Sequence, residues 1–333
     1  MGERNSTDRW RGVRARYRLG LAQRLVPFGA RWLPRIGERP ARFALSVILR
    51  RWIELCGLRD DGARATGARR AFQMALPDQD ADRLMERWTA ARSDALASSL
   101  VYLARWVAGR PSRTIRPRPS FRLPPDLPCV VGVLHYSIDP VVSVACLEAN
   151  GASRFRCAYY PPLPGTDDDR ELWFANTEVP KHIAETLLPI TDPWWLPDAL
   201  AHLSHGGSVM VALDAPFDSV HGAATRIDVG HAHVPLARSA ELFARLEGVQ
   251  LAFAFPERVS SSSWELGIVF VDDIEALARA AAEWIATHRD DWAGWPYITW
   301  RCDVLAMRRH AFERSGEVSC DGRSPRRRVG PAM

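Results

Sequence analysis

Lysine is almost absent from this chain of 333 residues. Arginine supplies 43 of the 44 basic residues, and the one lysine is Lys181. The basic residues outnumber the 39 acidic ones, so the net charge of +5 is carried by guanidinium groups, which suit phosphate geometry. A skewed genomic base composition produces the same bias, so the scarcity of lysine alone assigns no function.

Long apolar runs, signal-peptide features and paired-cysteine motifs are missing as well. No stretch approaches the roughly 18 consecutive apolar residues of a membrane-spanning helix, and the first residues lack the apolar region and cleavage site of a signal peptide, so we expect no membrane span. The six cysteines show no CxxC spacing: Cys56, Cys129, Cys146, Cys157, Cys302 and Cys320. This pattern argues against a zinc ribbon or a disulfide framework and favours a reducing, cytosolic setting.

The charge that is present is unevenly placed. Residues 1–122 hold 26 arginines against 11 acidic residues, a net charge of +15, whereas the remainder has a net charge of −10. We therefore expect the first part to face an anionic partner. The apolar content of 47% is ample for a globular core in the rest of the chain.

The first 58 residues have the pattern of arginine-rich amphipathic helices. Apolar residues recur at three- and four-residue spacing over 9–26, prolines then interrupt the pattern, and a second helix is predicted over 42–58 with Phe43, Val47 and Ile48 on its apolar face. Such helices can lie on anionic lipid. The alternatives are a helix packed on its own domain with a solvated basic face, and an RNA-binding arm.

Residues 63–107 keep a helical pattern, and the proline-rich segment 109–128 is predicted to be an irregular connector. Beyond it, apolar segments predict strands at 129–134, 155–160, 208–213, 250–255 and 266–271, with helices at 141–149, 181–188, 196–203 and 235–246. Strands alternating with helices indicate an α/β layer fold. We predict four parts: basic amphipathic helices (1–58), a helical region and connector (59–128), an α/β domain (129–312) and a disordered basic tail (313–333).

Two polar positions follow predicted strands. His135 ends the apolar run VVGVL, with Asp139 four residues later, and a carboxylate that orients an imidazole makes it a general base at neutral pH. Asp214 follows a second strand, where it could hold a substrate, position a loop or cap the next turn. Ligands of open α/β sheets bind beyond the carboxyl ends of the strands. The alternative is that His135 has only a structural role and caps the next helix.

Other motifs carry less weight. The segment FPER over 255–258 is similar to the Phe-Pro-Glu-Gly acceptor motif of glycerolipid acyltransferases but lacks its glycine, and a strand end is the simpler interpretation. The histidines between 202 and 233 lie in separate predicted segments, so we expect no metal site. There is no Gly-x-Ser-x-Gly sequence, which argues against a serine elbow.

Four blocks in order resemble the late acyltransferases of bacterial lipid A biosynthesis, the lauroyl/myristoyl branch of the lysophospholipid and glycerolipid acyltransferase superfamily. The resemblance covers most of residues 33–300. The blocks are ARRAFQMALPDQDADRLMERW, VVGVLHYSIDPVVS, GGSVMVALDAPFD with the later VPLARSAELFARLEGVQLAFAF, and ATHRDDWAGWPYITW. The resemblance implies a glycerolipid acyltransferase-like fold, in which helices flank a central mixed sheet behind an arginine-rich helical region.

The resemblance also implies a function. Acyl transfer would run from an acyl carrier protein or coenzyme A thioester to a hydroxyl or amine of a lipid or small molecule, with no cofactor beyond the thioester. His135 would be the base and Asp139 its orienting acid, with Asp214 and Arg238 as substrate-binding residues. The expected place is the cytoplasmic face of the inner membrane, as a peripheral protein on anionic lipid. We expect no nucleic-acid partner, and the oligomeric state stays open.

The chain departs from this family in two ways. The family places its acid five positions after the histidine, where this chain has Pro140, so Asp139 reaches the ring only if residues 136–139 form a turn. The N-terminal membrane-spanning segment usual in the family is missing or reduced to the broken amphipathic stretch. These departures suggest an acceptor other than lipid A. They also leave a second hypothesis, a degenerate relative that binds lipid or acyl carrier without chemistry.

Overall fold

The computed structural model describes residues 35–57, 62–107, 115–124, 127–136, 139–151, 154–159, 186–189, 194–214, 225–260, 263–295 and 298. The amphipathic helix predicted over 9–26 and the tail predicted over 313–333 lie outside these ranges. So does most of the helix predicted over 181–188. The division of the chain into four parts stays a prediction.

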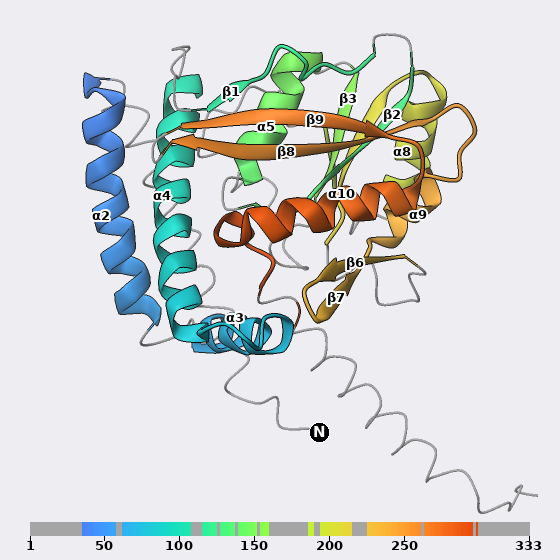
Figure 1. The fold of residues 1–333 in the computed structure, drawn as a ribbon. Coiled ribbons are helices and arrows are strands. Elements are labelled where there is room, and N and C mark those ends of the chain that lie inside the picture. Colours follow the sequence, from blue (N-terminus) through green and yellow to red (C-terminus); the bar gives the residue numbers. More distant parts are fainter. Residues whose placement is uncertain are drawn as a thin grey trace, which may run out of the picture.

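A mixed seven-stranded sheet forms the centre of the protein (Figure 1). Its order is β1-β9-β8-β2-β5-β3-β4, and every neighbouring pair is parallel except β8 and β9, which pair antiparallel. The strands are β1 (Ile115–Pro117), β2 (Cys129–Val133), β3 (Phe155–Tyr159), β4 (Leu187–Pro189), β5 (Ser208–Ala212), β8 (Gln250–Ser260) and β9 (Ser263–Val271). A separate antiparallel hairpin pairs β6 (Arg226–Val229) with β7 (Ala232–Pro235).

Strands β2 and β5 lie side by side in the middle of the sheet. All five residues of β2 are buried, as are the first four of β5. Continuous apolar runs of this kind are typical of parallel strands that are covered on both faces. Gly132 permits a close approach here, because a Cβ at this position would come within 2.8 Å of a methyl group of Leu213.

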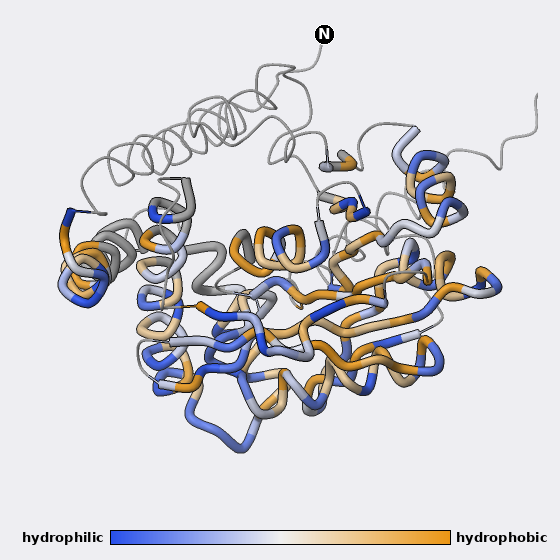
Figure 2. The backbone as a smooth tube through the Cα atoms, turned by 90° about the horizontal axis from the view of Figure 1, so that it is seen from above, coloured by the Kyte–Doolittle hydropathy of each residue, from blue (hydrophilic) through white to orange (hydrophobic). Residues whose placement is uncertain are grey.

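The described helices pack around this sheet (Figure 1). Helix α8 packs on β3, β4 and β5, α10 packs on β8 and on the β6–β7 hairpin, and α5 contacts β3 and α4. Their bounds are α5 (Asp139–Asn150), α8 (Trp195–Ser204), α9 (Arg238–Phe243) and α10 (Ile274–Thr287). Apolar residues follow the strands in Figure 2, so the main core lies between the sheet and these helices.

Three further helices precede the first strand. They are α2 (Glu38–Gly57), α3 (Gly62–Ala75) and α4 (Ala81–Val107), and α2 lies along α4 (Figure 1). An ion pair of 2.8 Å between Arg105 and Glu38 links α2 to α4. On α2, the large apolar side chains of Phe43 (71%), Val47 (47%) and Ile48 (60%) are exposed. None of the helices in the described ranges combines the length and the hydropathy that a membrane crossing needs.

The structure confirms the α/β class and the five predicted strands, although β8 and β9 are longer than the apolar pattern indicated. Three predictions need correction. Strand β1 lies within the segment predicted as an irregular connector, because it adds three residues to the exposed edge of β9. Residues 187 and 188, predicted as the end of a helix, belong to β4 beside β3. The prediction also missed α10 and the β6–β7 hairpin.

Candidate functional site

Two strand ends meet at the carboxyl edge of the sheet. Strands β2 and β5 are parallel neighbours in a register that pairs Val133 with Ala212. Two residues beyond this pair, the chain reaches His135 on one side and Asp214 on the other. The same register therefore brings together two residues that are 79 positions apart in the sequence.

The imidazole of His135 and the carboxylate of Asp214 form a hydrogen-bonded pair. Nδ1 of His135 lies 2.8 Å from Oδ1 of Asp214. The backbone N–H of His135 donates to the same carboxylate, at 3.0 Å from Oδ1 and 3.2 Å from Oδ2. The ring and the backbone of one residue thus both point at one carboxylate, which fixes the orientation of the ring.

Trp292 is a further donor to the carboxylate. Its indole N–H donates to Oδ2 of Asp214 at 2.7 Å, and its side chain is fully buried. The residue lies just after the 3₁₀ turn Arg289–Asp291, and it forms an isolated antiparallel bridge with Tyr136. The backbone N–H of Ala293 donates to the carbonyl oxygen of His135 at 2.7 Å.

These contacts set the tautomer of His135. An ionised carboxylate can only accept hydrogen bonds, so Nδ1 carries the ring proton in this pair and Nε2 is the basic nitrogen of the ring. The side chain of His135 is 26% exposed, whereas that of Asp214 is fully buried. The arrangement can therefore take a proton at Nε2 from a group at the surface, while the carboxylate stabilises the imidazolium that forms.

Among the predicted site residues, the structure places His135 at the carboxyl end of β2, as expected. The orienting acid was predicted to be Asp139. Helix α5 begins at Asp139, whose side chain lies outside the described residues. The carboxylate that lies at hydrogen-bond distance from Nδ1 of His135 is that of Asp214. Asp214 was predicted to bind substrate, but its carboxylate is enclosed by N–H donors. The contact with His135 fits the second role considered for Asp214, positioning of a loop, and the predicted substrate-binding role stays a prediction.

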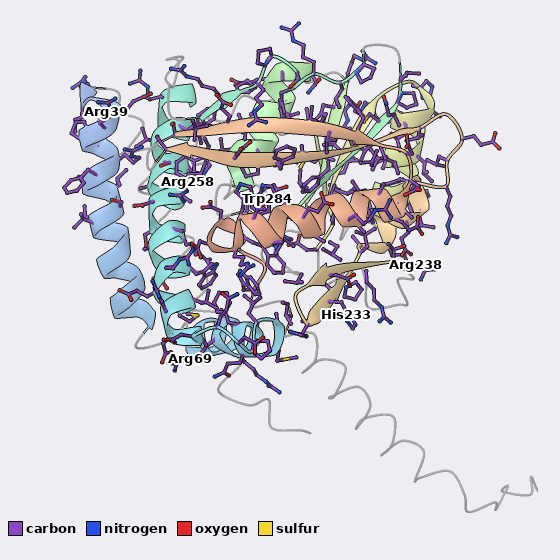
Figure 3. All side chains as sticks on the ribbon, viewed as in Figure 1. Arg39, Arg69, His233, Arg238, Arg258 and Trp284 are labelled. Atoms are coloured by element: carbon purple, nitrogen blue, oxygen red, sulfur yellow. The ribbon has the colours of Figure 1, made fainter. Side chains whose placement is uncertain are left out.

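Arg238 follows a residue that contacts the strand end of this site. It is the first residue of α9, and the backbone N–H of its neighbour Ala237 donates to the carbonyl oxygen of Leu213 at 2.7 Å. Its side chain is exposed on the side of the molecule away from α2, where His233 also lies (Figure 3). Its predicted role in substrate binding stays a prediction.

Sequence reasoning did not single out Trp292 as a residue of the candidate site. The sequence marks it only as one of several tryptophans, which are more often core residues than catalytic ones. A pair of acidic residues directly before it, Asp290 and Asp291, was the available signal. Both form ion pairs, Asp290 with Arg87 of α4 at 2.6 Å and Asp291 with Arg258 of β8 at 2.5 Å.

The FPER segment lies inside β8 rather than at a strand end. Arg258 binds Asp291 through Nε and Nη2 and stacks 4.6 Å from the ring centroid of Trp264. Glu257 pairs with Arg118. Figure 3 shows Arg258 beside α4, far from Arg238. These two charged side chains thus bind other parts of the chain.

Metal and thiol chemistry have little support within the described ranges. No three of their His, Cys, Asp and Glu side chains form a group that could hold a metal ion. His202 instead bonds the carbonyl oxygen of Arg154 at 3.0 Å through Nε2. Cys129, which begins β2, is buried, and this burial raises the pKa of its thiol to about 12. The thiol is therefore protonated at neutral pH and is a poor nucleophile.

The arrangement is thus a hydrogen-bonded His–Asp pair at the carboxyl edge of an α/β sheet, with an indole bound to the acid, and it has the geometry that a general base needs. Comparison of the chain with models of protein families and with curated proteins finds no match.

Proposed function

We propose that the protein is an acyltransferase that uses His135 as its general base. The hydrogen-bonded pair of His135 and Asp214, placed where α/β sheets bind ligands, is the observation that carries the proposal. The four sequence blocks that resemble the lipid A late acyltransferases select acyl transfer among the reactions open to such a base. We extend the proposal to their glycerolipid acyltransferase-like fold.

In this reaction the acceptor is a hydroxyl or an amine and the donor is a thioester of acyl carrier protein or coenzyme A. Nε2 of His135 takes the acceptor proton while the acceptor oxygen or nitrogen attacks the thioester carbonyl carbon. The new C–O or C–N bond forms, the C–S bond breaks, and the leaving thiolate takes the proton from the imidazolium. Asp214 stabilises the imidazolium meanwhile. The thioester is already activated, so these residues need no covalent intermediate.

The place of the reaction is proposed to be the cytoplasmic face of the inner membrane. The exposed apolar side chains of Phe43, Val47 and Ile48 on α2, with Arg39 at the outer edge of the molecule (Figure 3), support peripheral binding to anionic lipid. An arginine-rich surface also suits an acidic carrier protein.

The test measures thiol release from acyl-carrier-protein and acyl-coenzyme A donors with a panel of lipid and small-molecule alcohols and amines. His135→Ala should lower transfer at least about a hundredfold, the usual contribution of a general base. The matched control is His205→Ala, because His205 is exposed and precedes β5 at the opposite end of the strand from Asp214. Equal turnover by wild type and His135→Ala would refute the proposed mechanism.

The second candidate is a lipid- or carrier-binding protein without chemistry. The exposed apolar face of α2 favours it, since this face could bind lipid whether or not the site is active. Binding of the wild-type chain to anionic vesicles, together with no thioester turnover on any acceptor, would select this candidate over the enzyme.

A further inference from the structure

Within the described part of the chain, the carboxylate of Asp214 has three N–H donors. Two of them, the backbone and ring N–H groups of His135, belong to its histidine partner. The third is the indole N–H of Trp292, which reaches Oδ2 while the ring of His135 binds Oδ1. The indole and the imidazole therefore bind different oxygens of the same carboxylate.

Trp292 is itself held from several sides. Its carbonyl oxygen accepts the indole N–H of Trp88 on α4 at 2.8 Å. Its ring packs edge-on against Trp295, with ring centroids 4.9 Å apart. The ion pairs of Asp290 and Asp291 tie the preceding turn to α4 and β8. A side chain fixed in this way can aim a single N–H at one oxygen with little freedom to turn.

We infer that Trp292 is a positioning residue of the site, whose indole N–H holds the Asp214 carboxylate so that Oδ1 faces Nδ1 of His135. This role deepens the proposed acyl transfer and rests on it, because it concerns the same base. A hydrogen bond to an ionised carboxylate is stronger than a hydrogen bond between neutral groups. Its loss should therefore change the electrostatic interaction between the carboxylate and the imidazole.

The test follows the protonation of His135 without any substrate. Diethyl pyrocarbonate reacts with neutral imidazole, and mass spectrometry of the peptide that contains His135 gives the rate of modification at each pH. In Trp292→Phe the carboxylate loses a donor, its negative charge is less compensated, and it stabilises the imidazolium more. We expect the midpoint of the pH dependence to rise by roughly one pH unit.

The matched control is Trp295→Phe. Trp295 is equally buried and lies three residues away, but its indole donates to the carbonyl oxygen of Arg289 at 2.8 Å. Phenylalanine at position 295 keeps an aromatic ring against Trp292, so the midpoint of this variant should equal that of the wild type. Benzothienylalanine at position 292 keeps the shape of the indole and replaces its N–H by sulfur, so it should raise the midpoint as Trp292→Phe does. This second variant keeps the test valid where the smaller ring disturbs folding.

The outcomes separate this inference from the proposed function. A raised midpoint in both variants at position 292, with no change in Trp295→Phe, supports the positioning role even if no acceptor is ever acylated. Equal midpoints in all four proteins, or an equal rise in Trp295→Phe, would overturn it. Where transfer is measurable, the variants should lower kcat about tenfold and leave KM unchanged, since the N–H acts on the base and not on substrate binding.

Discussion

The carboxylate of Asp214 accepts hydrogen bonds from several N–H groups. Its side chain is fully buried, and burial of a charge without partners costs several kcal/mol. The three N–H donors found among the described residues offset that cost. The residue therefore carries two tasks at once, because the same hydrogen bonds stabilise its charge and orient the ring of His135.

Substitution of Asp214 by asparagine should affect both tasks. The amide keeps the shape of the side chain but has no charge, so it neither stabilises the imidazolium nor binds three N–H groups as strongly. We expect transfer to fall at least about a hundredfold and the free energy of unfolding to fall by roughly 1–3 kcal/mol. Thiol release and urea denaturation measure these two effects.

Asp228→Asn is the control for this substitution. Asp228 is an exposed aspartate of β6, outside the seven-stranded sheet, so its change should leave both quantities within error. If Asp214→Asn retained full transfer while His135→Ala lost it, the carboxylate would not be the partner of the catalytic base.

At the scale of the element, α2 combines a packed side with an apolar exposed one. Ala41 is buried, and Glu38 binds Arg105 of α4. The exposed residues Phe43 and Val47 are four positions apart and therefore lie on the same face of the helix, and Ile48 lies beside this face. Exposed apolar side chains gathered in this way form a candidate interaction surface.

Replacing Phe43 and Ile48 by aspartate should weaken binding to anionic vesicles at least about tenfold, since apolar area is lost and two negative charges are added (about 1.4 kcal/mol per tenfold). Vesicle flotation measures this, with the urea midpoint as a check on folding. Leu200→Asp, at an exposed apolar position of α8, is the control and should float like the wild type. Undiminished flotation of the double variant would exclude α2 as the lipid-binding element.

At the scale of the whole molecule, the apolar patterns predicted β2 and β5 and placed His135 and Asp214 each at the end of a strand. The patterns could not predict that these two strands are neighbours, because strand order depends on long-range packing that leaves no local signal. The nearest carboxylate in the sequence, Asp139, was therefore taken as the partner. Strands β1 and β4 escaped prediction because three residues are too few for a recognisable period.

The global stability of the protein should fall on acidification, in part through His202. Burial lowers the pKa of this side chain below its ordinary value of 6.5, and the charges of Arg156, His205 and Arg154 lower it further, against the hydrogen bond to the Arg154 carbonyl. Below pH 6.5 the unfolded chain then binds more protons than the folded one, so the free energy of unfolding decreases as the pH falls toward the lowered pKa.

His202→Gln keeps a donor for the carbonyl oxygen of Arg154 and removes the titration. Urea denaturation between pH 7.5 and 5 should show a smaller loss of the free energy of unfolding than in the wild type. The two slopes against pH should differ by the equivalent of less than one proton bound on unfolding. Ser204→Ala, a change at an exposed position of the same helix without titration, should keep the wild-type slope. Identical slopes for wild type and His202→Gln would assign the acid sensitivity to other groups.

The position of Trp292 has a consequence for the timing of synthesis. A ribosome adds this residue 78 positions after Asp214, when β2, β5 and α10 have already been made. A nascent chain that has emerged only as far as α10 holds the histidine and its acid but lacks the donor behind them. The hydrogen-bond arrangement around Asp214 would therefore be completed late in synthesis, after the sheet has formed. In the proposed function, an incomplete chain would transfer acyl groups poorly even where its core has folded.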